Sequence, residues 1–427
     1  MRPTSSTVDH LRLARGTIAS AILLAGCGGD QLADRQEPLV DTLRGGTVVV
    51  QNPARGVWDI DPGARWTVVE SLRLGSSDGF GPDVFGFVSE LIVDDLGRMW
   101  VVDAMANELR VFDADGLFVR TLGRSGEGPS EFKRVGPAFL GPNSTVWVED
   151  LSLLRWEVFD TAGVRVEGHP VPSSLRGGLR HWTRDGLLLV LARLPGSRPM
   201  VGLVVHEKTQ DGAVEPEGRV LELPPEPRPE GLIAVRSDRF STEVPAPFTS
   251  RSFGVFGAGL DYWFSDGRAR RGSYEVHQLD LDSGTTRLTI KRRFTPAEIP
   301  DSLRALSIDS LRQEFREQGM PTGALTLDVV PEEYPPFIDF ALSADGTLWV
   351  RRVFPDGLVG FDVFAPDGRL LGRPNMTVDL AGMRIAAITT TSIFGIDTDE
   401  LGVHRVVRLD IQRPGGTPQS WAGAEHQ

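Results

Sequence analysis

The sequence has very little cysteine: Cys27 is the only one among 427 residues. A single cysteine excludes an intramolecular disulfide framework and a cysteine-based zinc site. The sequence also lacks an apolar run of the roughly 20 residues that a membrane-spanning helix needs. We therefore expect neither a disulfide-stabilised fold nor a helix that crosses a bilayer.

Motifs of nucleophilic, metal-dependent and phosphate chemistry are also missing. There is no Gly-x-Ser-x-Gly elbow and no P-loop, and the histidines show neither His-x-His nor His-Glu-x-x-His spacing. Two histidines lie near the chain ends, and the other five occur singly: His169, His181, His206, His277 and His404. We interpret His277 and His404, which occupy strand-like positions, as packing or surface residues.

Positive charge is in deficit. The sequence has 45 lysines and arginines against 58 aspartates and glutamates, a net charge of −13, and no basic stripe interrupts it. The negative electrostatic field that results from this net charge would repel a nucleic-acid backbone, so the sequence predicts no nucleic-acid partner. Nearly all positive charges are arginines, single or in pairs such as Arg292-Arg293 and Arg351-Arg352, which we interpret as solvated or salt-bridged surface.

Residues 1–26 have the pattern of an export signal. Three arginines precede a short apolar stretch, as in a secretory signal peptide. The stretch ends in Leu24-Ala25-Gly26-Cys27, which resembles the lipobox of bacterial lipoproteins. That resemblance implies cleavage before Cys27 and a diacylglycerol on its thiol. The alternative is an ordinary buried cysteine at a helix end.

Acylation of Cys27 would make a lipid bilayer one partner of the chain. Two or three acyl chains give stable anchoring, because each buried CH₂ contributes about 0.8 kcal/mol. The polar residues 27–46 are expected to form a flexible tether. Gly28 rather than Asp follows the cysteine, which by resemblance to the sorting rule of two-membraned bacteria favours the outer membrane. We expect an exported chain anchored to the cell membrane or outer membrane.

An internal repeat decides the fold. Four segments share a turn of Gly, Asp or Asn followed by a strand with a tryptophan and a further apolar residue: 94–103, 141–150, 257–266 and 343–352. Two weaker copies, 183–190 and 391–396, carry Leu or Phe in place of Trp. A second strand, turn and strand follow each copy, most clearly at 109–123.

The last copy stops before its outer strand, and residues 66–74 near the amino end supply a matching alternating pattern. Pairing the two ends would close a ring and cover a sheet edge. The sequence therefore predicts an all-β fold over residues 47–411, a six-bladed β-propeller of four-stranded blades closed by an N-terminal strand. The four tryptophans would lie buried between blades, and residues 412–427 would form a disordered tail.

The first copy resembles the repeat of the NHL-repeat and TolB-like propellers. The likeness rests on Val102-Asp103, Asn107, Arg110-Val111-Phe112, Asp115-Gly116 and the segment from Gly123 to Phe132. It is specific in blade one, schematic in blades three and six, and implies the six-bladed fold. Residues 123–128 look like a phosphate loop, but they link two strands rather than open a helix, so we interpret them as an interblade turn.

Two segments interrupt the repeat. Residues 222–248 are proline-rich and are predicted to form a long extended crossing between blades three and four. Residues about 295–318 predict a helical insertion between blades four and five, with Thr295 as N-cap and Pro296 at the first helical position. We expect this helix to pack across one mouth of the propeller; a lid or a partner-binding element is the alternative.

Propeller ligands usually bind at the central funnel, among loops that join the second and third strands and loops between blades. Converging carboxylates there could hold Ca²⁺, or could be balanced by arginines. Each candidate could instead cap its own turn. The topology places ten residues on this face: Asp103, Asn107, Glu149, Asp150, Asp266, Arg268, Arg351, Arg352, Asp397 and Asp399.

Three classes of function remain open. The missing catalytic motifs favour a non-catalytic binding or scaffold lipoprotein whose partner is an envelope protein, peptide or glycan. The alternative is a metal-assisted hydrolase or lyase, lactonase-like, which needs carboxylates and a histidine at one ion. No histidine falls in a loop between second and third strands, so binding is preferred. A sensor whose helical insertion moves on binding is the third class.

Overall fold

The computed structural model describes residues 37–171, 180–183, 186–194, 200–206, 219–223, 230–236, 241–257, 259–270 and 272–415. The predicted signal peptide, Cys27 and residues 416–427 lie outside these ranges. No helix within them is long and apolar enough to span a bilayer.

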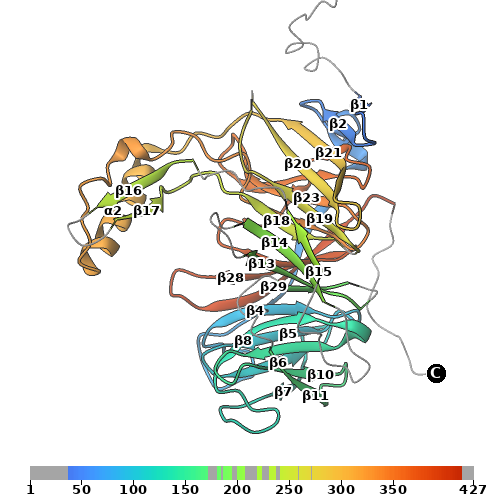
Figure 1. The fold of residues 1–427 in the computed structure, drawn as a ribbon, viewed down its shortest axis with the longest axis vertical. Coiled ribbons are helices and arrows are strands. Elements are labelled where there is room, and N and C mark those ends of the chain that lie inside the picture. Colours follow the sequence, from blue (N-terminus) through green and yellow to red (C-terminus); the bar gives the residue numbers. More distant parts are fainter. Residues whose placement is uncertain are drawn as a thin grey trace, which may run out of the picture.

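The described chain forms seven sheets, and six of them, each built on four antiparallel strands, are the blades predicted from the repeat (Figure 1). Blade one contains β4 (Val88–Val93), β5 (Met99–Asp103), β6 (Glu108–Phe112) and β7 (Phe118–Leu122). Blade two contains β8 (Val135–Leu140), β9 (Val146–Asp150), β10 (Arg155–Phe159) and β11 (Arg165–Pro170). Blade three contains β12 (Arg180–Trp182), β13 (Leu188–Leu194), β14 (Met200–His206) and β15 (Arg219–Glu222).

The second half of the ring repeats this order. Blade four contains β18 (Phe253–Phe256), β19 (Asp261–Ser265), β20 (Ser273–Asp280) and β21 (Thr285–Arg293). Blade five contains β22 (Asp339–Leu342), β23 (Leu348–Val353), β24 (Val359–Phe364) and β25 (Leu370–Gly372). Blade six contains β27 (Arg384–Ile388), β28 (Ser392–Thr398), β29 (His404–Gln412) and the amino-terminal β3 (Thr67–Leu74).

The ring is closed by β3, which pairs antiparallel with β29 from Leu74 opposite Val406 to Thr67 opposite Gln412. The short β26 (Asn375–Met376) pairs with the other edge of β3. The predicted closure by residues 66–74 is therefore confirmed. Since strands from both ends share one sheet, the amino and carboxyl parts of the propeller hold each other in place.

The amino-terminal segment contributes more structure than the predicted tether. Two strands, β1 (Leu39–Thr42) and β2 (Val48–Asn52), extend blade four, with β2 parallel to β21 and β1 antiparallel to β2. The tether prediction is thus wrong for residues 39–42, because the open edge of β2 offers backbone hydrogen bonds that polar composition does not reveal. A short helix, α1 (Val57–Ile60), and a 3-10 turn, η1 (Pro62–Ala64), then lead to β3.

The four repeat tryptophans are core residues, as predicted: Trp100, Trp147, Trp263 and Trp349 are at most 4% exposed. Full burial of such a side chain contributes roughly 1.5–3 kcal/mol. A carboxylate that precedes the tryptophan also accepts its indole N–H. Asp94 Oδ2, in the turn before β5, accepts from Trp100 at 3.0 Å, and Asp261 Oδ2, at the start of β19, accepts from Trp263 at 2.7 Å. In blade two, where the turn is η2 (Pro142–Ser144), Thr145 has this role.

Two insertions pack together and form a lobe that projects to one side of the propeller (Figure 1). The first is a hairpin of β16 (Leu232–Arg236) and β17 (Ser241–Pro245); the second contains α2 (Asp301–Glu317) and the 3-10 turn η4 (Leu327–Val329). We call residues 230–236, 241–250 and 295–337 the lobe. The lobe has its own apolar core, which includes Ile233, Val235, Ile308, Phe315, Leu325 and Val330.

The lobe corrects both predictions for the interruptions. Residues 222–248 are not simply an extended crossing, because the alternating Ile233 and Val235 form one buried side of the hairpin. The helix α2 packs on that side rather than across the mouth of the propeller. Neither insertion alone can cover its apolar residues, and each covers those of the other.

The helix also begins later than predicted, at Asp301 after Pro300. Residues 297–299 are extended. The Ile299 N–H donates to the Glu332 carbonyl, and the backbone of Glu298 forms an antiparallel β-bridge with that of Glu333. Proline at position 300 disfavours the helical conformation at Ile299, so the predicted Thr295 cap is wrong.

Candidate ligand-binding face

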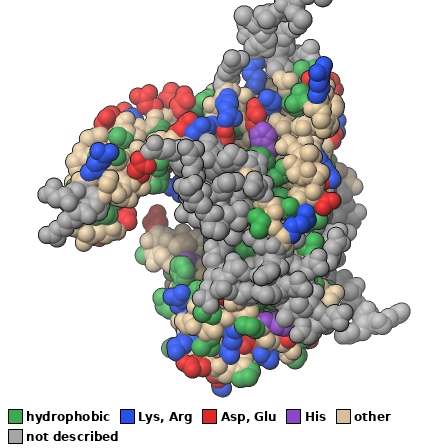
Figure 2. All heavy atoms as spheres, viewed as in Figure 1, with side chains coloured by type: hydrophobic (Ala, Val, Ile, Leu, Met, Phe, Trp, Pro, Cys, Tyr) green, Lys and Arg blue, Asp and Glu red, His purple; other side chains and the backbone are tan. Residues whose placement is uncertain are grey.

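One side of the propeller carries the loops between second and third strands and the crossings between blades. We call it the ligand face; in blades four to six its described residues are 266–270, 272, 294–338, 354–358, 373–383 and 399–403. The lobe arises from this face, because both insertions are crossings between blades. Figure 2 shows acidic side chains gathered along the outer edge of the lobe.

Asp103 and Asp150 lie at equivalent ends of β5 and β9, and both are fully buried. Asp103 accepts backbone hydrogen bonds from Gly86 and Phe87 in the crossing before blade one, and from Met105 and Ala106 in its own loop. Asp150 does the same with the backbone of residues 133, 134, 152 and 153. Each carboxylate therefore fastens a crossing to a loop.

Asn107 and Glu149 belong to the same region of blades one and two. Asn107 adopts a left-handed conformation (φ 56°), and its side-chain oxygen accepts a 3.0 Å hydrogen bond from the Val135 N–H, which links the two blades. Glu149 lies in β9, 2% exposed, opposite Trp156 of β10. Both positions contribute to the packing of neighbouring strands.

The candidates in blades four and six are held by ion pairs. Asp266 pairs with Arg270, and Arg268 pairs with Glu230 of the lobe at 3.1 Å. Asp397 pairs with Arg73 at 2.6 Å, and Asp399 pairs with Arg405 at 2.7 Å while capping its own turn at Leu401 and Val403. These four residues bind to neighbours in their own blades or in the lobe.

Arg351 and Arg352 are buried, 7% and 2% exposed, and so is Arg292 at 8%. The interpretation of these arginines as surface residues is therefore wrong, although all three are salt-bridged. Arg351 forms a bidentate pair with Asp339, whereas Arg352 and Arg292 share Asp362. Arg351 and Arg352 are consecutive in β23, so their side chains point to opposite faces of the blade-five sheet. Arg351 donates to the Met383 carbonyl in the crossing to blade six, and Arg352 donates to the Thr295 carbonyl in the crossing from blade four.

Among the described residues, no group of three or more His, Cys, Asp or Glu side chains is arranged to hold a metal ion. The described histidine rings lie on strands: His169 on β11, His181 on β12, His277 on β20 and His404 on β29. The Ca²⁺ site proposed for the funnel stays a prediction. The carboxylates best placed for it, Asp103 and Asp150, already accept several backbone hydrogen bonds each.

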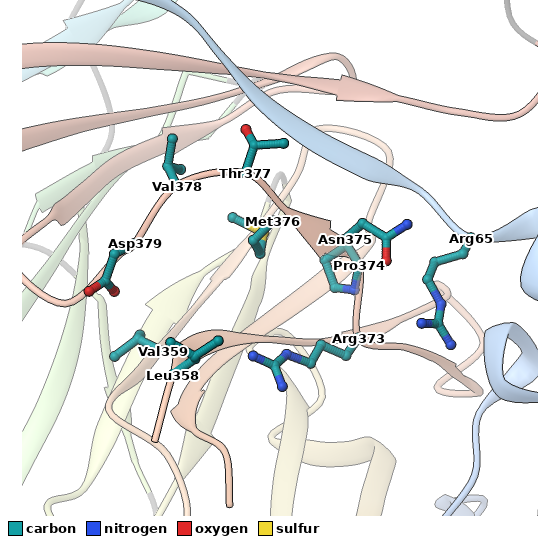
Figure 3. Close-up of a pocket in the computed structure, with 10 residues that line it drawn as sticks. All are labelled: Arg65, Leu358, Val359, Arg373, Pro374, Asn375, Met376, Thr377, Val378 and Asp379. Carbon is teal, nitrogen blue, oxygen red and sulfur yellow. The ribbon is translucent and has the colours of Figure 1, made fainter. Parts of the chain in front are cut away.

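A pocket of about 420 Å³ opens on the ligand face between blades five and six (Figure 3). Arg65 and Arg373 lie at one end and Asp379 at the other, with Leu358, Val359 and Met376 between them. Arg373 is held by Asp356 at 2.6 Å, and Arg65 by Asp59 at 3.0 Å. We call this cavity the blade five–six pocket; it offers opposite charges at its ends and apolar surface between.

A second pocket, of about 410 Å³, lies on the other side of the loop 354–358, between blades four and five. The described residues that line it include Arg292, Arg293 and Arg352 together with Phe294 and Phe354, and none of them is acidic. We call it the blade four–five pocket. The two pockets are neighbours: Arg373, which lines the first, stacks 4.0 Å from the ring centre of Phe354, which lines the second.

Two ionisable groups beside the blade four–five pocket have shifted pKa values. Burial opposes ionisation of Asp362, but Arg292 and Arg352 outweigh it and lower the pKa of that carboxyl. Burial and the charge of Asp362 raise the pKa of Tyr274 well above its ordinary value, so the phenol is neutral and donates to Asp362 at 3.0 Å. Arg292, Asp362 and Tyr274 were not predicted as site residues, and neither were Arg65, Arg373 and Asp379.

Comparison with known proteins agrees with the fold. A family model described as a 6-bladed beta-propeller matches residues 84–142. The NHL repeat-containing protein 3 of Mus musculus is 32% identical over 130 residues, which cover 28% of this chain and 36% of the mouse protein. The matched stretch thus spans about a third of that relative, and it supports the predicted likeness to NHL-type propellers.

Two solved structures are similar in fold only. Virginiamycin B lyase from Staphylococcus aureus is 12% identical, with 81% of this chain and 99% of that chain covered and a TM-score of 0.41. A gluconolactonase from Xanthomonas campestris is 13% identical, with 88% and 96% covered and a TM-score of 0.34. The reactions in those names belong to those proteins.

Proposed function

We propose that this chain is a non-catalytic binding module of the bacterial cell envelope. Its ligand face takes a protein, peptide or glycan, while acylated Cys27 holds the propeller at a membrane. One observation carries the binding proposal: two pockets of similar volume adjoin on one face and are lined mainly by arginines and apolar side chains. Guanidinium groups stay charged at all physiological pH values, so they suit recognition of charged groups more than proton transfer.

The blade five–six pocket fits an extended ligand. Arg65 and Arg373 favour a negative group at one end, Asp379 favours a positive group at the other, and the apolar residues between them would cover the middle of the ligand. Because the lobe rises from the same face, a bound chain would extend from the pocket toward the lobe or over blade six.

A matched pair of variants tests this proposal. Leu358 lines the pocket and Leu96 lies in a turn on the opposite face; they are 54% and 58% exposed, so both positions tolerate a polar side chain. The full-length protein, Leu358→Asp and Leu96→Asp would be applied to peptide and glycan arrays. We expect Leu358→Asp to lose at least tenfold in affinity for the ligands that bind, with Leu96→Asp unchanged. Equal loss or no loss in the two variants would contradict the proposal.

The membrane anchor has a separate test. Cys27→Ser removes the thiol that a diacylglycerol would occupy, and cells producing it are expected to release the propeller from the membrane fraction. Mass spectrometry of the unaltered protein should find the acyl mass on the peptide that begins at Cys27. An unmodified cysteine in the membrane fraction would refute lipid anchoring without affecting the binding proposal.

A further inference from the structure

The repeat itself marks an unusual position in blade five. The third residue after the buried aromatic is aspartate in blades one, two, four and six: Asp103, Asp150, Asp266 and Asp397. In blade five the same position holds Arg352. The charge is therefore reversed at one place in the ring, where the side chain is 2% exposed.

Arg352 does not replace the aspartates in their role. Asp103 and Asp150 accept backbone N–H groups, whereas a guanidinium only donates. Arg352 donates to the Thr295 carbonyl at 2.7 Å and lies 3.4 Å from Asp362, and its Nε has no hydrogen-bond partner among the described residues. Donors are thus left over at this site, where blades one, two, four and six have acceptors.

The charges around Arg352 do not balance. Arg292 and Arg352 share the single carboxylate of Asp362, each at 3.4 Å, and the neutral Tyr274 donates to the same carboxylate. Two buried cations with one buried anion leave one positive charge, and burial of an unpaired charge is costly. Arg293 also lines the cavity, while the described part of the lining contains no acid. A chain with a net charge of −13 thus keeps a positive pocket.

We propose that Arg292 and Arg352 bind an oxyanion of the ligand, a carboxylate or a phosphate, in the blade four–five pocket. The inference rests on the proposed function and names the chemistry of one part of the ligand. Guanidinium groups bind both oxyanions through charge-assisted, often bidentate hydrogen bonds. An incoming oxyanion would supply the negative charge that Asp362 alone does not.

The site is arranged before the ligand arrives. The guanidinium of Arg352 lies 4.5 Å from the ring centre of Phe294 and 4.9 Å from that of Phe354, so two aromatic rings fix its orientation. Arg292 is fixed by the carbonyls of Pro53 and Ala54, at 3.0 and 3.1 Å. Neither cation has to be ordered on binding, which reduces the entropic cost of association.

The first experiment uses the full-length protein and two probes, inorganic phosphate and acetate, titrated separately by calorimetry with ionic strength held constant by chloride. Saturable binding of either probe supports the site, and the tighter probe shows whether a tetrahedral or a planar oxyanion fits it. A probe at a free concentration of ten times its Kd lowers the equilibrium constant of unfolding about tenfold, and a thermal melt detects this stabilisation. No binding of either probe up to 50 mM, roughly the weakest useful affinity for such a fragment, overturns the proposal.

Two variants place the probe in this pocket. Arg352→Met keeps the length of the side chain and removes its charge, and should weaken probe binding at least tenfold. Ala54→Asp adds a carboxylate at an exposed position of the lining; it should raise the melting temperature without probe and remove the effect of the probe. The control is Arg287→Met, at a side chain 65% exposed on β21, which should bind like the unaltered protein.

The outcomes separate this inference from the proposed function. Unchanged probe affinity in both Arg352→Met and Ala54→Asp refutes the oxyanion site, even if the array ligands still depend on Leu358. If Arg352→Met does not fold, Ala54→Asp decides alone, because its side chain replaces an exposed one. If probe binding is weakened in Arg352→Met and lost in Ala54→Asp, the site is supported, even where Leu358→Asp leaves the binding of array ligands unaffected.

Discussion

The Oδ2 of Asp103 accepts a hydrogen bond from the backbone N–H of Gly86 at 2.9 Å, so the end of a blade-one strand is fastened to the crossing that enters the blade. Asp103→Ala would leave four backbone N–H groups and Arg110 without this acceptor. A buried charged acceptor of this kind is worth about 3–5 kcal/mol. We expect Asp103→Ala to lower the melting temperature by several degrees.

A chelator distinguishes this structural role from a Ca²⁺ site. If Asp103 acts through backbone hydrogen bonds, EDTA should leave the melting temperature of the unaltered protein unchanged, and added Ca²⁺ should not restore Asp103→Ala. Metal analysis that finds a stoichiometric ion, lost together with stability on chelation, would instead support the predicted ion site.

The propeller was predictable because its signal is repeated. Each copy combines a turn residue, a buried tryptophan and alternating strands, and the missing last strand points to residues 66–74. The lobe was not predictable in the same way, since α2 and the hairpin are separated by about 60 residues and show their apolar sides only when packed together. The site was predicted only in part, at Arg352, for a related reason. The sequence shows Arg352 in a position of aspartates, but its pairing with Arg292 depends on how blades four and five meet.

Closure of the ring by β3 predicts a large difference between two valines. Val68 in β3 is fully buried in the core that blades five and six share, whereas Val119 in β7 is 44% exposed. Val68→Asp buries an unpaired carboxylate in the closing sheet, so the whole propeller should be destabilised by more than about 3 kcal/mol. Val119→Asp should change stability by less than about 0.5 kcal/mol.

Chemical denaturation of both valine variants, followed by tryptophan fluorescence, measures the difference. The buried tryptophans of blades one to five report on the whole ring. Equal stability of the two variants would show that closure does not couple the chain ends.

The lobe should unfold on its own. Its core is separate from the blade cores, and Phe315 is 3% exposed within it. Phe315→Ala removes an aromatic side chain at a typical cost of about 3–5 kcal/mol, which falls on a small unit. We expect faster amide exchange in residues 232–236, 241–245 and 301–330, measured by mass spectrometry, with exchange in β5 and β9 unchanged. Leu306→Ala, at a residue 64% exposed on the same helix, is the control and should change neither.

Two partly buried histidines predict how stability depends on pH. Burial is the main cause that lowers the pKa of His181, which stacks on Phe256, and of His277, which bonds Thr289. In the unfolded chain both rings take up a proton near pH 6.5, whereas the folded protein keeps them neutral to lower pH. Between these values the unfolded state binds more protons, so stability is full above about pH 6.5 and falls as the pH drops below it.

Thermal melts should show this loss between pH 7 and pH 5, and the double variant His181→Gln, His277→Gln should lose less over that range than the unaltered protein. At pH 8, where neither ring is charged in either state, the slope should vanish for both proteins. An equal pH dependence in the two proteins between pH 7 and pH 5 would mean that other groups cause it.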